Sequence, residues 1–140
     1  KARYVFENYK VNCFSEDTGL EIDALNGEPG VYTARYAGEA RDKEANMAKA
    51  IANLEGKSNR GAQFRTVIAL IIDGEEHTFE GIARGTIAMQ KQGTEGFGYD
   101  PIFIPAGFDR SFAQMTQTEK NEISHRGQAV RKLVKFLRTL

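Results

Sequence analysis

The sequence predicts an α/β domain in which a mixed β-sheet, rich in hairpins on one side, is flanked by helices. One observation is the segment from Phe64 to Ile72, which is rich in β-branched residues and is followed by Asp73-Gly74, a dipeptide typical of tight hairpins. A second is the helical spacing of apolar residues from Asp42 to Leu54 and again after Ser124. Together these patterns indicate a sheet with helices packed against it.

The first elements expected along the chain are a helix end and two strands. Residues 1–9 resemble the end of a helix, and Val11 to Ser15 is short and apolar, as a strand would be. Leu20 to Leu25 alternates apolar and acidic residues, which is typical of a half-buried strand. Asn26 to Gly30 is rich in residues that favour turns.

The middle of the chain predicts a helix and a hairpin. The helix from Asp42 to Leu54, with Gly56 just past its end, would place four apolar residues on one face: Ala45, Ala48, Ile51 and Ala52. The strand returning from the hairpin would run from about Glu76 through Ala88, with Gly81 and Gly85 marking a bulge or a close approach of backbone.

The last third predicts a loop, a strand and helices. Gly93 to Gly98 contains three glycines, and Pro101 to Ile104 is a short apolar strand. Thr116 to Glu119 fits a capping box at a helix start. Ser124 begins the final helix, whose apolar face would be Val130, Leu133, Val134 and Leu137.

Composition bounds the class of protein. The chain has 140 residues, of which 41% are hydrophobic, so it is one domain or part of one with a real core. Its formal net charge is zero, which argues against a nucleic-acid binder but leaves room for a nucleotide ligand. The single cysteine favours a reducing, cytoplasmic setting, and no apolar run approaches the roughly 20 residues that span a bilayer. The uncapped start at Lys1 predicts a fragment that lacks preceding secondary structure; a processed or engineered start is the alternative.

Glu16-Asp17-Thr18 places two acids at an expected strand end, where α/β folds tend to present catalytic side chains. Carboxylates there suit Mg²⁺, which prefers a few carboxylates together with substrate phosphates and water. A solvated acidic turn is the alternative interpretation.

Phe97 lies between two glycines, which let backbone approach a ligand closely. An aromatic ring in such a loop suits stacking on a base, worth about 1–3 kcal/mol. Alternatively, Phe97, Tyr99 and Phe103 are core residues. Asp100 is either a turn residue or a base acceptor.

Ser124 is well placed to cap the last helix, so His125 and Arg126 would lie in its first turn, against the helix dipole. A local conflict of this kind suggests function, because rule-breaking sites often are functional. Arginine only donates hydrogen bonds and would therefore pair with a base carbonyl. Lys120 lies one helical turn earlier and could share a face with Ser124. A surface His-Arg pair without a role is the alternative.

These residues together resemble a known family, the inosine triphosphate pyrophosphatase (Ham) family of non-canonical purine nucleoside triphosphate pyrophosphatases. The resemblance covers essentially the whole chain, in order and spacing. It rests on four segments: Glu16 to Leu20, Leu25 to Tyr36, Gly96 to Phe103, and Glu119 to Asn121 with Ile123 to Gly127.

The resemblance implies an ITPase-like (Maf/Ham) fold, a homodimer and Mg²⁺-dependent hydrolysis of ITP, dITP and XTP to the monophosphate and pyrophosphate. Asp17 would bind Mg²⁺ and activate water, with Glu16 assisting the metal. The implied substrate-binding residues are Lys1, Thr18, Phe97, Gly98, Tyr99, Asp100, Lys120, Ser124, His125 and Arg126.

The chain departs from the family pattern at its start, because the family's first strand, Thr/Ser-x-Asn-x-x-Lys phosphate loop and following metal-binding Glu do not precede Lys1. A nucleotide-binding module impaired in catalysis is therefore the alternative function. A hydrolase of another nucleotide class is a third, which only the donors from Ser124 to Arg126 argue against.

Overall fold

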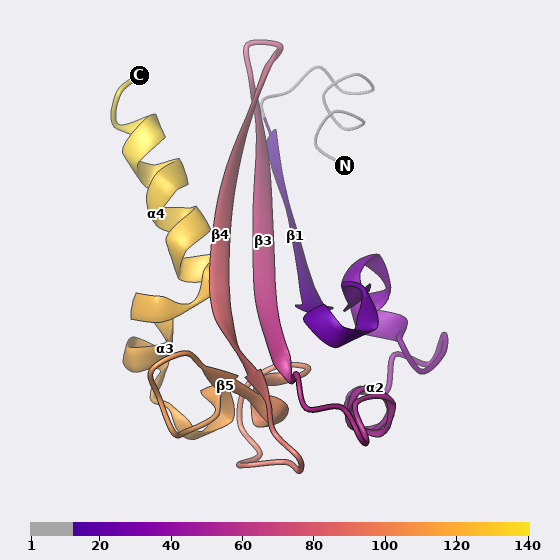
Figure 1. Cartoon of the computed structure of the whole chain (residues 1–140). Coiled ribbons are helices and arrows are strands. Elements are labelled where there is room, and N and C mark those ends of the chain that lie inside the picture. Colours follow the sequence, from indigo (N-terminus) through magenta and orange to yellow (C-terminus); the bar gives the residue numbers. More distant parts are fainter. Residues whose placement is uncertain (1–12) are drawn as a thin grey trace.

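A computed structural model describes residues 13–140, so the expected helix end over residues 1–9 and the predicted role of Lys1 lie outside the described residues. Within this range the strands form one sheet in the order β2-β1-β3-β4-β5, and all four pairings are antiparallel. The strands are β1 (Cys13–Ile22), β2 (Glu28–Pro29), β3 (Gly61–Ile72), β4 (Glu75–Ile87) and β5 (Phe103–Pro105). The predicted sheet flanked by helices is confirmed (Figure 1).

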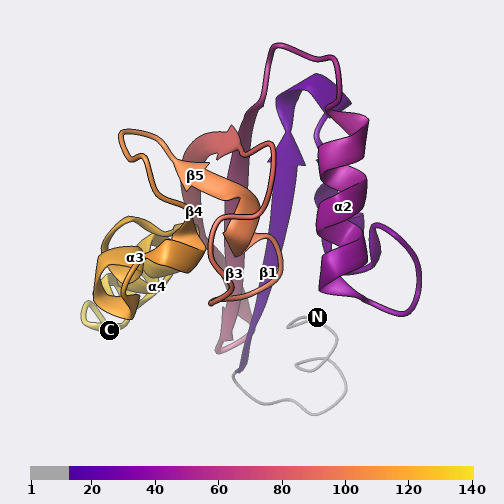
Figure 2. The ribbon, with the colours of Figure 1, turned by 90° about the horizontal axis from the view of Figure 1, so that it is seen from below.

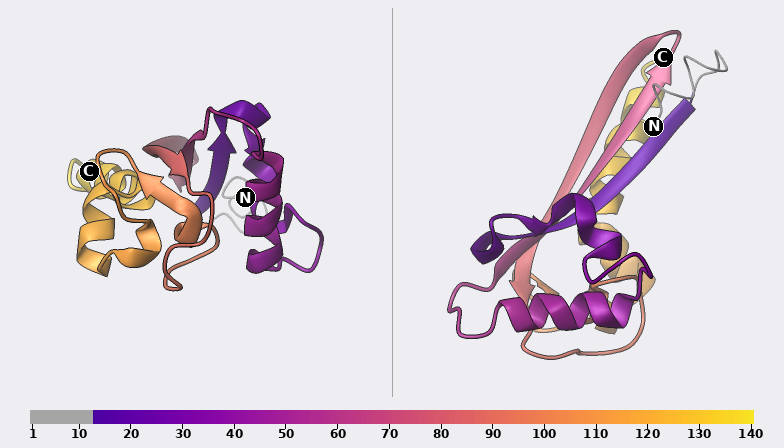
Figure 3. Two further views of the ribbon diagram at one scale, coloured as in Figure 1. Left: turned by 60° about the horizontal axis from the view of Figure 1, so that its bottom comes forward. Right: turned by 90° about the vertical axis from the view of Figure 1, so that its right-hand side faces the viewer.

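The predicted hairpin is formed by β3 and β4. Asp73 and Gly74 both have positive φ, 50° and 82°, as a two-residue turn between twisted strands requires. The two strands pair without a bulge, and the hairpin extends away from α2, with α4 running alongside it (Figure 3). Gly81 and Gly85 mark close approaches: a Cβ on Gly81 would lie 1.9 Å from the carbonyl oxygen of His125.

The two short strands expected near the start are one continuous strand, β1. Leu20 and Ile22 are buried, as the alternation predicts, but the strand ends at Ile22 and not at Leu25. The chain leaves the sheet there because Asn26 and Gly27 take positive φ and close the 3₁₀ turn η1 (Asp23–Leu25). Short 3₁₀ segments follow at η2 (Gly30–Arg35), η3 (Asp100–Ile102) and η4 (Phe112–Gln114), so the strand expected from Pro101 begins only at Phe103.

Helix α2 (Lys43–Asn53) begins as predicted, with the Asp42 carboxylate accepting from the N–H groups of its first turn. The apolar face named from the sequence is not the buried one: Asn46, Met47 and Ala50 are buried, whereas Ala45, Ala48 and Ala52 are exposed and Ile51 is half-buried. Asn46 faces inward because its amide donates to the Ala34 carbonyl and accepts from the Ala37 N–H. An apolarity pattern cannot foresee a buried amide that bonds to a neighbouring backbone.

Helices α3 (Gln117–Ile123) and α4 (His125–Leu137) meet at Ser124, and the predicted capping box at Thr116 is present. The expected apolar face of α4 is only partly buried. Ala129 and Leu133 are buried and Val130 packs against them, whereas Val134 and Leu137 are largely exposed. Within residues 13–140, no helix combines the length and apolar character needed to cross a membrane.

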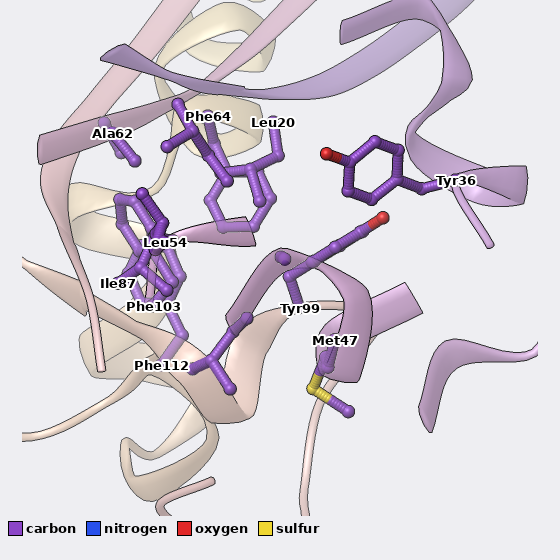
Figure 4. Close-up of a cluster of buried hydrophobic side chains, with 14 residues drawn as sticks. Leu20, Tyr36, Met47, Leu54, Ala62, Phe64, Ile87, Tyr99, Phe103 and Phe112 are labelled. Carbon is purple, nitrogen blue, oxygen red and sulfur yellow. The ribbon is translucent and has the colours of Figure 1, made fainter. Parts of the chain in front are cut away.

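The core has two clusters of buried side chains, and both lie on the same face of the sheet. In the β1–β3 pairing, even-numbered residues of one strand pair with even-numbered residues of the other, so their side chains point to the same face. One cluster joins α4 to Ile68 and Leu70 near the hairpin tip. The larger cluster packs α2 and the segments η3 to η4 against the other end of the sheet (Figure 4). Figure 2 shows α2 on one side of the sheet and α3 with α4 on the other.

Candidate active site

A cavity of about 700 Å³ lies between these helices. All the predicted site residues within residues 13–140 line it except Asp17: Glu16, Thr18, Phe97, Gly98, Tyr99, Asp100, Lys120, Ser124, His125 and Arg126. Four separate segments of the chain therefore supply one concave surface, as ligand sites usually require.

One wall of the cavity is held by a buried ion pair. The Lys120 ammonium donates to the Asp100 carboxylate, and the two side chains are only 12% and 5% exposed. The same carboxylate accepts the N–H of Phe97 at 2.9 Å. Asp100 thus acts as a turn residue that ties the glycine loop to α3, and Gly96 is required there because a Cβ would lie 2.4 Å from the carboxylate.

The two aromatic residues of this loop differ completely in burial. Phe97 is 81% exposed and its ring lies 5.3 Å from the Lys120 ammonium, so it is not a core residue. Tyr99 is buried, and its hydroxyl donates to the Thr33 carbonyl at 2.6 Å. Desolvation raises the pKa of Tyr99, so it stays a neutral donor. The loop backbone is therefore tied in place, while the ring of Phe97 keeps an exposed face at the cavity.

His125 stands at the start of α4, directly after its cap. Ser124 Oγ accepts the Gly127 N–H at 3.0 Å, as predicted for an N-cap. The imidazole is 8% exposed and stacks on Phe64, with ring centres 4.6 Å apart. Burial, aided by the charges of Lys120 and Arg126, lowers the pKa of His125 to about 4, so the ring is neutral near pH 7. Its Nδ1 is buried without a hydrogen-bond partner among the described residues.

Arg126 crosses from α4 to the sheet. Its Nε donates to Glu16 Oε1 on β1 at 2.8 Å, although 110 positions separate the two residues in the chain. Thr18, two residues further along the same face of β1, shares a 2.8 Å hydrogen bond with the buried Thr66 of β3. Glu16 and Thr18 are thereby fixed on the floor of the cavity.

Asp17 does not join them. Successive side chains of a strand point to opposite faces, so Asp17 is exposed on the face away from Glu16 and Thr18. Within residues 13–140 no three His, Cys, Asp or Glu side chains come together as a metal site. A Mg²⁺ site formed jointly by Glu16 and Asp17 does not fit this strand. A single carboxylate with substrate phosphates does fit the preferences of the ion.

The sequence missed several residues that line the cavity. Phe64 gave no signal beyond its place in a strand. Arg41 and Lys43 flank the start of α2 and are exposed, with no ion pair to any residue in the described part of the chain. Asn46 gave no signal, because its burial depends on hydrogen bonds to the backbone of residues outside its helix.

Comparisons with known proteins agree with this arrangement. The model of the Ham1 family matches residues 1–136. The chain belongs to the Ham1 family. A protein of Flavobacterium johnsoniae named dITP/XTP pyrophosphatase is 54% identical over 98% of this chain and 71% of its own length. A protein of the same name from Flavobacterium psychrophilum is 53% identical over 99% of this chain and 73% of its own length.

Solved structures show the same fold. The Ham1 protein of Staphylococcus aureus superposes with a TM-score of 0.95 at 42% identity, covering 99% of this chain and 72% of that one. The ITPase-like fold predicted from the sequence is therefore confirmed, and the cavity lies in a known family architecture.

Proposed function

We propose that this Ham1-family chain hydrolyses non-canonical purine nucleoside triphosphates (ITP, dITP and XTP) to the monophosphate and pyrophosphate, with Mg²⁺, and so cleanses the nucleotide pool. Its relatives are named dITP/XTP pyrophosphatase, which identifies the class of enzyme as a hydrolase of nucleoside triphosphates. A cytoplasmic location, favoured by the single cysteine, and a homodimer, implied by the family resemblance, are part of the same proposal.

The observation that carries the proposal is the set of polar groups around the cavity. Arg126 can only donate, and His125 Nδ1 is buried without a partner in the described residues. Buried polar atoms are almost always hydrogen-bonded, which is consistent with a ligand completing this one. A guanidinium beside the base matches the 6-oxo group of hypoxanthine or xanthine and mismatches the amino group of adenine.

The remaining residues have complementary roles in the proposal. The exposed ring of Phe97 stacks on the base, and Gly98 to Asp100 hold that ring in place through the contacts of Tyr99 and Asp100. In this proposal Asp17, on the face of β1 opposite the cavity, would hold Mg²⁺ together with the phosphates and orient the attacking water, so the triphosphate would extend past β1 from the cavity. Lys1, outside the described residues, would contact a phosphate. Mg²⁺ supplies neutralisation of phosphate charge and a lowered pKa of bound water.

The test is pyrophosphate release from ITP and from ATP, with and without Mg²⁺, by the chain and by Asp17→Asn. Turnover of ITP well above ATP is expected, because unpaired donors reject a mismatched base by about 10⁴ or more where the site is built for hydrogen bonding. Asp17→Asn should lower turnover at least about a hundredfold while ITP still binds.

If no turnover is seen, calorimetric measurement of ITP binding in the same samples distinguishes the possible reasons. Binding without turnover in the unmodified chain would favour the alternative of a nucleotide-binding module. Absence of both binding and turnover would refute the proposed site. Equal turnover of ITP and ATP would refute the base preference alone.

A further inference from the structure

We propose that Glu16 is a positioning residue for base recognition: its carboxylate holds the guanidinium of Arg126 over the cavity, so that the remaining donors meet the 6-oxo group of the purine. This inference rests on the proposed function. It gives Glu16 a role different from the metal-assisting one that the family resemblance implies.

The contact itself is specific. Arg126 Nε donates to Glu16 Oε1 at 2.8 Å, the length of a charge-assisted hydrogen bond. It joins the first turn of α4 to the central part of β1, two elements that approach each other across the cavity they both line. A bond to Nε alone leaves the two Nη groups, which donate to no other residue within residues 13–140.

The need for such a support follows from the position of Arg126. Its side chain is 65% exposed and lies at a helix N-terminus, where the dipole disfavours a cation. An arginine held by nothing would sample many rotamers, and ordering a long side chain on binding costs affinity. Glu16 is 28% exposed, and its backbone pairs with Ile68 of β3. Glu16 is therefore held more firmly than the exposed side chain of Arg126.

The placement also argues against metal binding by Glu16. Its carboxylate already accepts from a guanidinium, and its neighbour Asp17 faces the other side of the strand. Glu16 and Asp17, adjacent in the sequence, are thereby assigned to different tasks, one to the base and one to the metal and water.

The experiment measures ITP binding by calorimetry in EDTA, where no metal role can contribute, for the unmodified chain, Glu16→Ala, Glu16→Gln, Arg126→Ala and the double variant Glu16→Ala with Arg126→Ala. We expect Glu16→Ala to weaken ITP binding about tenfold, as loss of a charge-assisted hydrogen bond does. Glu16→Gln should stay within about threefold, because an amide oxygen also accepts from Nε. The double variant should bind ITP no more weakly than Arg126→Ala alone.

Glu21→Gln is the matched control. Glu21 lies on the same strand but on the opposite face, where it accepts from Gln63 at 2.8 Å and lies 3.9 Å from Arg65. Its replacement should leave ITP binding unchanged. The Mg²⁺ concentration that gives half-maximal hydrolysis should be the same in Glu16→Gln and in the unmodified chain.

Three results would overturn the inference: unchanged ITP affinity of Glu16→Ala in EDTA, losses that multiply in the double variant, or a higher Mg²⁺ requirement in Glu16→Gln with normal ITP affinity. The last would restore the metal role. If the unmodified chain neither binds nor hydrolyses ITP, the proposed function fails first, and this inference fails with it.

Discussion

The base-binding end of the cavity and the acidic end on β1 are built in different ways. At the proposed base-binding end, a glycine loop, the last turn of α3 and the start of α4 contribute side chains to one surface. Asp100 and Lys120 form an ion pair with little exposure there, and His125 is buried against Phe64. On β1, an extended backbone separates neighbours, so Glu16 faces the cavity and Asp17 does not. Neighbouring residues of a motif can therefore point into one cluster where the chain turns. Where the chain is extended, they point to opposite faces of the sheet.

The difference also concerns pre-organisation. The guanidinium of Arg126 is held by Glu16, and the loop that carries Phe97 is held by Asp100, before any ligand binds. Residues 13–140 present no cluster of three His, Cys, Asp or Glu side chains that could hold a metal ion. Discrimination between bases benefits from a rigid site, because unpaired donors then penalise the wrong base. Phosphate chemistry with Mg²⁺ relies instead on oxygens that the substrate brings.

The largest effect should come from breaking the buried ion pair at the base-binding end. Lys120→Met leaves the Asp100 carboxylate, 5% exposed, without its cation, which costs about 3–5 kcal/mol of unfolding free energy. Denaturant unfolding measures this. Lys91→Met is the matched control, because its pair with Glu44 at 2.7 Å is 46% and 56% exposed and should be worth less than about 1 kcal/mol. Equal losses in the two variants would show that the base-binding end is not pre-organised by this pair.

A second effect concerns acid stability. The pKa of His125 falls from 6.5 to about 4 on folding. Between pH 6.5 and pH 4, His125 is therefore protonated in the unfolded chain but neutral in the folded chain. The stability from its neutral form is full above pH 6.5 and is lost as pH falls toward 4, by roughly 3 kcal/mol in total. Urea unfolding from pH 7 to 4 measures the slope.

In His125→Gln, the free energy of unfolding should depend less steeply on pH between 7 and 4, because glutamine does not take up a proton there. The nearby charges of Lys120 and Arg126 are unchanged in this variant. A variant whose stability falls with acid as steeply as that of the unmodified chain would mean that the slope arises from carboxylates elsewhere.

The smallest predicted effect is on affinity alone. Phe97 is 81% exposed, so Phe97→Ala should leave the free energy of unfolding nearly unchanged. It should weaken ITP binding by about 1–3 kcal/mol, the usual value of base stacking. Calorimetry gives the affinity and thermal unfolding the stability. Phe97→Tyr, which keeps a stacking face, should retain the affinity; if it weakens binding as much as the alanine, the ring does not stack.

Local patterns predicted the elements well, because each depended on neighbours in sequence. The hairpin at Asp73-Gly74 follows from two residues that accept positive φ, and the caps at Thr116 and Ser124 follow from side chains that reach their own helix. The predicted helix faces were less successful. In α2, the amide of Asn46 is buried by bonds to Ala34 and Ala37, which no helical repeat contains.

The sequence by itself determined the family resemblance, the main strands and helices and ten of the residues that line the cavity, since motifs record chemistry that can be recognised without coordinates. Only the tertiary structure decided which of those residues contact one another and which face of the sheet each one occupies. It placed Glu16 against Arg126 across 110 positions, stacked His125 on Phe64 so that its charge is suppressed, and turned Asp17 to the other face. Contact between distant segments, burial and strand register are properties of the folded chain, and they place two adjacent acids on opposite faces of β1.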